Sequence, residues 1–111
     1  MYKPLEEKIW ALKVDSEVYI ETPCNIQDVT IGRNTKVGRY SDISRTTIGN
    51  NCSIGKNCII INSEIKDNCT IDDSSIVKDC FIAKGTTINS FCQLLSCNTE
   101  EFEVIDAFSK R

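Results

Sequence analysis

Aliphatic residues recur every seventeen positions along this chain, in three interleaved columns. Steps of six, six and five residues separate the columns, a spacing that suits neither an amphipathic helix nor a simple alternating strand. A short strand followed by a corner, used three times per period, explains these steps. The pattern therefore predicts an all-β fold, a single-stranded parallel β-helix of about five coils. The columns are Val14, Ile31, Ile48, Ile65 and Ile82; Ile20, Val37, Ile54, Ile71 and Ile88; and Ile26, Ile43, Ile60, Val77 and Leu94.

Small residues occupy nearly every position two before a column residue, and strand alternation puts these positions on the same inward face. All seven cysteines fall in this slot, so we interpret them as reduced thiols that pack in the interior. No CxxC pair and no histidine accompanies them, and we predict neither a metal site nor a cofactor. Stacked thiols are expected for Cys52 with Cys69 and for Cys80 with Cys97. The seven are Cys24, Cys52, Cys58, Cys69, Cys80, Cys92 and Cys97.

Residues suited to tight corners follow the first column at a constant distance of three positions. Asparagine and glycine tolerate the left-handed backbone that such corners need. These positions are Glu17, Asn34, Asn51, Asn68 and Gly85. The remaining glycines directly follow column residues, where we expect backbones to approach closely: Gly32, Gly38, Gly49 and Gly55.

One outer face is predicted to differ from the other two. Ile59, Ile61, Ile76 and Leu95 flank the third column at outward positions, and the seventeen-residue spacing should stack Ile59 on Ile76. Two further arrangements stay open: Ile76 turns inward in place of Val77, or the C-terminal segment covers the cluster. We predict that the four side chains form a docking patch for a protein partner, either a paralogous β-helix or a second copy.

The pattern predicts three segments: residues 1–11 as a linker or N-terminal cap, 12–98 as the β-helix, and 99–111 as a C-terminal cap and tail. Asn98 and Glu101 stand at capping-box spacing, which predicts a short capping helix after the last coil. Alternation near Val104 leaves an extra strand open. Ile9 lies seventeen residues before Ile26, which leaves open an incomplete first coil.

Composition narrows the function further. The chain has 111 residues, one domain's worth, and a net charge of −3, so it offers no general attraction to nucleic acid or to acidic membranes. No apolar run approaches membrane-spanning length and no signal peptide is visible. We expect a cytoplasmic protein.

The coils at residues 28–38, 41–58 and 62–71 resemble the C-terminal β-helix domain of the gamma or epsilon subunit of eukaryotic translation initiation factor 2B. The Ser-x-Ile-x-Arg step at 41–45 is more similar to gamma, and residues 2–4 are similar to the linker before that domain. The resemblance implies a left-handed helix and a non-catalytic module that helps subunits pair in a guanine nucleotide exchange complex. No nucleotide-binding residue carries over.

Two other families share the repeat. Sugar-nucleotide pyrophosphorylases use the same coils in their C-terminal domains. Hexapeptide-repeat acyltransferases have the pattern too, but they use a histidine as general base, and this chain has none. An acyltransferase here would need a carboxylate base such as Asp72 or Asp73. We therefore predict no catalytic residue and no enzyme activity.

Overall fold

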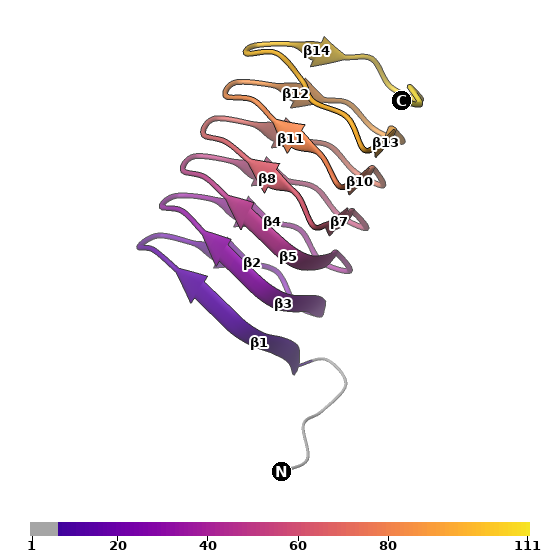
Figure 1. The fold of residues 1–111 in the computed structure, drawn as a ribbon. Coiled ribbons are helices and arrows are strands. Elements are labelled where there is room, and N and C mark those ends of the chain that lie inside the picture. The colour runs from indigo at the N-terminus through magenta and orange to yellow at the C-terminus, as the bar shows by residue number, and fades with distance from the viewer. Residues whose placement is uncertain (1–6) are drawn as a thin grey trace.

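Parallel strands stacked into a solenoid form the whole described structure, a computed structural model that describes the backbone of residues 7–111 and the side chains of residues 12–111 (Figure 1). The linker predicted around residues 2–4 lies outside the described residues. All regular elements in this part of the chain are strands. The chain climbs from one coil to the next, and each strand pairs with the strand one coil above it.

Two parallel sheets make up the sides of the solenoid. One has six strands in the order β14-β12-β9-β6-β4-β2 and the other has eight. The six-stranded sheet comprises β2 (Tyr19–Ile20), β4 (Lys36–Val37), β6 (Ser53–Ile54), β9 (Thr70–Ile71), β12 (Thr87–Ile88) and β14 (Val104–Ile105). The eight-stranded sheet comprises β1 (Glu7–Val14), β3 (Cys24–Ile31), β5 (Asp42–Ile48), β7 (Ile59–Ile61), β8 (Glu64–Ile65), β10 (Ile76–Lys78), β11 (Phe81–Ile82) and β13 (Gln93–Leu95).

The eight-stranded sheet folds over two of the three sides. Its long strands bend at residues with a left-handed backbone, Asp28 (φ 55°) in β3 and Arg45 (φ 47°) in β5. In later coils the same bend separates β7 from β8 and β10 from β11. The predicted strand-and-corner unit, used three times per coil, is therefore confirmed.

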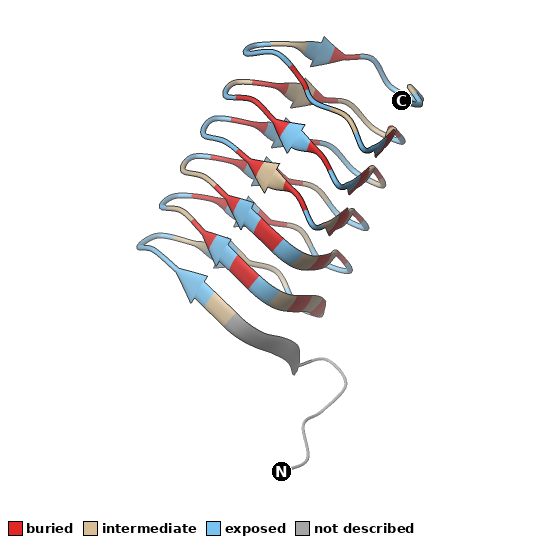
Figure 2. Cartoon of the chain, viewed as in Figure 1, coloured by how far each residue is buried: buried red, intermediate tan, exposed pale blue. Residues whose placement is uncertain are grey.

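The seventeen-residue period is the register of both sheets. Partners such as Ile26 and Ile43, or Ile54 and Ile71, are seventeen residues apart. Column residues from the second coil onward are at most 3% exposed, and from β3 onward buried positions largely alternate with more exposed ones along the strands (Figure 2). Val14 is 51% exposed because it lies in the first coil. Close packing of stacked aliphatic side chains stabilises a repeat that no coil could stabilise alone.

The predicted C-terminal helix is wrong. Residues after Cys97 continue the ladder: Asn98 bridges to Phe81, and β14 pairs with β12 through Ile88 and Ile105. The stack therefore has about six turns rather than five, as the six strands of the smaller sheet require. Ile105 is 1% exposed, so it gains more as a further core residue of the second column than on a helix face.

The first coil also extends further than the segment boundary at residue 12 implies. Ile9 pairs in register with Ile26 within β1 and β3, so the incomplete first coil is confirmed. The strand begins at Glu7, inside the segment expected to be a linker or cap.

Corner geometry agrees with the sequence. Glu17, Asn34, Asn51 and Asn68 have φ between 57° and 60°, and Gly85 has φ 75°. A second corner column, which the sequence did not indicate, is also left-handed: Tyr40, Asn57, Ser74, Phe91 and Phe108.

Three glycines leave room for a polar side chain from the next coil. A Cβ on Gly32, Gly49 or Gly55 would lie 2.3 Å from the Oδ1 atom of the residue eighteen positions later. Each of these oxygens accepts a hydrogen bond of 2.8 Å from the backbone N–H that follows the glycine. The accepting residues are Asn50, Asp67 and Asp73. The predicted close approach at these glycines is thus confirmed, and its cause is a hydrogen bond between coils.

Among the described residues, charged side chains take the inward slots of the repeat in the last coil. Glu103 follows Thr86 by seventeen residues in a small inward slot, and Arg111 follows Leu94 in the third column. Their side chains pair at 2.7 Å, and Glu103 also accepts the N–H of Glu100 at 3.0 Å. These contacts lower the pKa of Glu103, with the Glu100 hydrogen bond the larger cause, and raise that of Arg111. An ion pair therefore takes two positions at which the preceding coil has Thr86 and Leu94.

Candidate interaction surface

The predicted docking residues lie on the outer face of β7, β10 and β13. Ile76 pairs in register with Ile59 in the coil below and with Gln93 in the coil above. Val77, the next residue, is fully buried, so Ile76 points outward and is half-buried. The alternative in which Ile76 replaces Val77 in the core is therefore wrong.

The four aliphatic side chains do not form one unbroken cluster. Ile61 and Leu95 lie in the same outward column, but Lys78 stands between them in the register. Leu95 is 44% exposed, and Ile59 and Ile61 are half-buried. Residues 99–111 continue the coils above this face instead of folding over it (Figure 1). The face thus carries two pieces of apolar surface with a lysine between them.

Exposed aromatic side chains border this face, and the aliphatic pattern alone did not reveal them. Tyr40, Phe91 and Phe108 occupy the corner column that leads into the strands of the face, and they are 59%, 55% and 72% exposed. The rings of Phe91 and Phe108 stack with centroids 5.2 Å apart and planes within 2°. Their seventeen-residue spacing was the signal that could have revealed them.

These aromatic residues occupy corner positions whose backbone angles are unfavourable for bulky side chains. Tyr40, Phe91 and Phe108 have φ between 61° and 65°, whereas Asn57 fills the same corner position with a residue that tolerates this region. A left-handed backbone costs a bulky residue about 1 kcal/mol or more. Stacking between Phe91 and Phe108 offsets part of this cost. All three rings stay more than half exposed, so burial within the chain recovers little more of it.

The two carboxylates considered as a catalytic base have structural contacts instead. Asp73 accepts a hydrogen bond from the backbone N–H of Lys56 at 2.8 Å, and Asp72 accepts one from the N–H of Asp73 at 2.9 Å. Both residues are exposed at a corner. Their hydrogen bonds connect coils and order the turn.

The seven cysteines are free, six of them buried and Cys97 half-buried. The interpretation as interior thiols is confirmed. Cys80 and Cys97 stack with their sulfur atoms 3.6 Å apart. Burial and the neighbouring Cys80 raise the pKa of Cys97 to about 11. The neighbouring Cys69 thiol, together with burial, raises the pKa of Cys52, and the neighbouring Cys52 lowers the pKa of Cys69.

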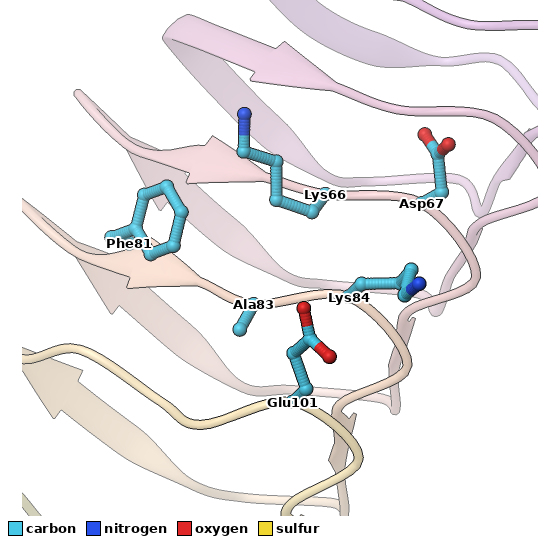
Figure 3. Close-up of a pocket in the computed structure, with 6 residues that line it drawn as sticks. All are labelled: Lys66, Asp67, Phe81, Ala83, Lys84 and Glu101. Atoms are coloured by element: carbon cyan, nitrogen blue, oxygen red, sulfur yellow. The ribbon is translucent and has the colours of Figure 1, made fainter.

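A shallow hollow of about 380 Å³ opens beside β8 and β11 (Figure 3). Lys66 lies over the ring of Phe81, with its Nζ atom 5.5 Å from the ring centroid. The hollow alternates charges of both signs, so it has no net preference for an anion. Its lining residues are Lys66, Asp67, Phe81, Ala83, Lys84 and Glu101.

No helix of the described residues is long and apolar enough to cross a membrane. Within the same residues, no group of three or more histidine, cysteine, aspartate or glutamate side chains could hold a metal ion.

Two solved structures resemble this fold at low sequence identity. A protein of Bacillus cereus that is assigned as an acetyltransferase has a TM-score of 0.49 and 20% identity, over 89% of this chain and 67% of its own. A hexapeptide transferase family protein from Anaplasma phagocytophilum has a TM-score of 0.37 and 17% identity, over 86% of this chain and 70% of its own. Similarity at this level says nothing about activity. No curated protein matches the chain.

A family model matches residues 11–104, which is most of the chain. Its description is the LbH, or left-handed β-helix, domain of EIF2B subunit epsilon. Epsilon is one of the two subunits that the coil sequences resemble, and the preference for gamma drawn from the step at residues 41–45 has no support from this match. The chain belongs to the family of left-handed β-helix domains of the EIF2B epsilon subunit.

Proposed function

We propose that this chain is a non-catalytic assembly module, which pairs with another β-helix subunit through the outer face of β7, β10 and β13. The observation that carries the proposal is the outward stacking of Ile59 on Ile76, with Ile61 beside them. Aliphatic side chains on the outer face of a solenoid do not stabilise its core, and their burial would favour association.

Family membership supports the proposal that the partner is another subunit of the same complex. The parent protein named by the family is a translation initiation factor subunit, so we expect the partner to be a paralogous subunit, such as gamma, in a guanine nucleotide exchange complex in the cytoplasm. The absence of histidine and the structural contacts of Asp72 and Asp73 agree with a module that does no chemistry.

The test measures binding of the chain to the β-helix domain of a gamma-type subunit by titration calorimetry. Ile59→Arg with Ile61→Arg should weaken binding by at least about a hundredfold, because two guanidinium groups would be desolvated without partners. The matched control is Ser53→Arg with Thr70→Arg, which places the same charges on exposed stacked positions of β6 and β9. The control should bind like the unchanged chain.

Equal binding by both double variants would contradict the proposal. Trimerisation together with binding of acyl coenzyme A would instead favour an acyltransferase-like enzyme.

A further inference from the structure

We infer that the face carrying Ile76 also pairs with itself: two copies of this chain associate face to face, with antiparallel helix axes and a two-fold axis at Ile76. The inference rests on the proposed function, since it names a second copy as a partner of the same face. It follows from the register, the charges and the aromatic corners of that face.

The outward columns define what a two-fold axis brings together. One column runs Asn25, Asp42, Ile59, Ile76, Gln93 and Lys110 along successive coils. A two-fold axis that runs parallel to the strands at the level of Ile76 generates a second copy whose coils run in the reverse order. Each outward column of the first copy then faces the same column of the second copy. Ile76 then meets Ile76 of the second copy, and Asp42 meets Lys110 of the second copy. Opposite charges at mirrored positions favour this register over its neighbours.

The second outward column is complementary in the same register. It runs Ser44, Ile61, Lys78 and Leu95, so the axis places Ile61 opposite Leu95 of the second copy. Lys78 separates Ile61 from Leu95 within one chain, but in the dimer each of these two side chains contacts the other one of the second copy. Shifting the axis by half a coil towards Ile59 would instead set Ile61 against a lysine.

The left-handed corner column places aromatic side chains at the rim of the contact. The same axis sets Tyr40 near Phe108 of the second copy and Phe91 near Asn57 of the second copy. Exposed rings held at unfavourable backbone angles then gain a partner, which explains why these corners carry aromatic residues rather than asparagine.

The size of the surface predicts a weak dimer. An aromatic side chain presents about 200 Å² when it is wholly exposed, so the three rings offer roughly 370 Å² per copy at their exposed fractions. With the aliphatic side chains added, two copies bury about 1,000 Å² in total, near the lower limit for a specific interface. We expect a dissociation constant in the micromolar range or weaker.

Two positions are unfavourable, because the axis sets Ile59 opposite Gln93 and Lys78 opposite Lys78 of the second copy. The like-charge contact between the two lysines costs more than the contact of an aliphatic with a neutral polar side chain. This makes a sharp test. Lys78→Leu removes the like-charge contact and joins the two apolar pieces, so the variant should dimerise at least about tenfold more tightly in sedimentation equilibrium. Phe91→Asn with Phe108→Asn should weaken the dimer at least about tenfold, without loss of thermal stability, because asparagine suits the left-handed corner.

Charge reversal tests the register itself. Asp42→Lys and Lys110→Asp should each weaken the dimer severalfold, and the double variant should restore it. The two residues lie four coils apart in one chain, about 19 Å at the usual strand spacing, so restoration requires contact between copies.

Sedimentation across about 1 µM to 1 mM brackets the expected affinity. A chain that stays monomeric throughout, even as Lys78→Leu, would overturn the inference. A dimer that charge reversal does not restore would overturn the register. The two proposals can fail separately. If the unchanged chain is monomeric but binds a gamma-type partner, and the Ile59→Arg, Ile61→Arg variant loses that partner, the proposed function stands and only the self-pairing is refuted.

Discussion

Replacing Gly49 with alanine tests the idea that a carboxylate from the next coil dictates where this repeat carries glycine. An added Cβ would lie 2.3 Å from the Oδ1 atom of Asp67, 2.8 Å from its backbone nitrogen and 2.9 Å from the carbonyl carbon of Lys66. All three distances are shorter than van der Waals contact allows. The Asp67 carboxylate must turn away, and the backbone of the next coil must also shift.

The expected destabilisation of Gly49→Ala follows from these two responses. Turning the carboxylate breaks its 2.8 Å hydrogen bond from the Asn50 N–H, which is exposed and can bind water instead, a loss of about 1 kcal/mol. Crowding against the backbone adds about 2 kcal/mol. The variant should therefore lose about 3 kcal/mol of unfolding free energy.

A double-mutant cycle separates the two contributions. Asp67→Ala alone should cost about 1 kcal/mol, because it removes only the hydrogen bond. In that background Gly49→Ala retains just the backbone crowding of about 2 kcal/mol, so the double variant should lose about 3 kcal/mol rather than the additive sum of about 4 kcal/mol. Urea denaturation followed by circular dichroism measures each corner of the cycle. Strict additivity would refute the reasoning.

Lys66 supplies the matched control. It occupies the repeat position of Gly49, seventeen residues later, and the residue eighteen positions beyond it is Lys84 rather than an asparagine or aspartate. No acceptor needs the space there, which is why a lysine fits. Lys66→Ala should change the unfolding free energy by less than about 1 kcal/mol, since its ion pair with Glu64 is exposed.

The inward ion pair and the buried thiols yield two further predictions. The lowered pKa of Glu103 stabilises the fold above the unfolded value of 4.5, and this contribution disappears as the pH falls through the lower folded value. Glu103→Gln should therefore lose less than about 1 kcal/mol at pH 7 in urea denaturation, given that Arg111 is 39% exposed, and its difference from the parent chain should shrink as the pH falls through the folded pKa of Glu103. A difference that grows on acidification would contradict this. In native protein at pH 8, a thiol reagent should modify Cys97 alone and slowly, because its pKa is about 11, whereas denaturation should expose all seven thiols. Cys69 should stay unmodified despite its lowered pKa, since it is 1% exposed, and its rapid labelling would refute the packing.

Local chemistry accounts for the parts of the fold that the sequence predicted correctly. The period is the strand register, so each column residue meets its own equivalent one coil away. Burial then follows from alternation, and the cysteines fall into the small inward slot without reference to any distant contact. Asn34, Asn51 and Asn68 revealed corners because asparagine adopts the left-handed backbone more readily than most other residues do.

The C-terminal segment shows where local reasoning failed. Phe102, Ile105 and Phe108 recur at helical spacing, but an open ladder above β12 offers Ile105 a buried slot and its backbone groups partners in the coil below. A helix could satisfy its own hydrogen bonds without burying that side chain against the coil below. The coils below this segment favour the strand over the helix. The fourteen C-terminal residues taken alone carry no information about those coils.

Sequence alone determined the class of fold, the interior residues and the face on which outward aliphatic side chains gather, because a repeat carries its own register. Only the tertiary structure decided how that face is composed. Lys78 separates Ile61 from Leu95, and aromatic corners at Phe91 and Phe108 extend its border. These features depend on which residues of different coils become neighbours around a corner. Corner backbone angles, rather than hydrophobic pattern, set that arrangement.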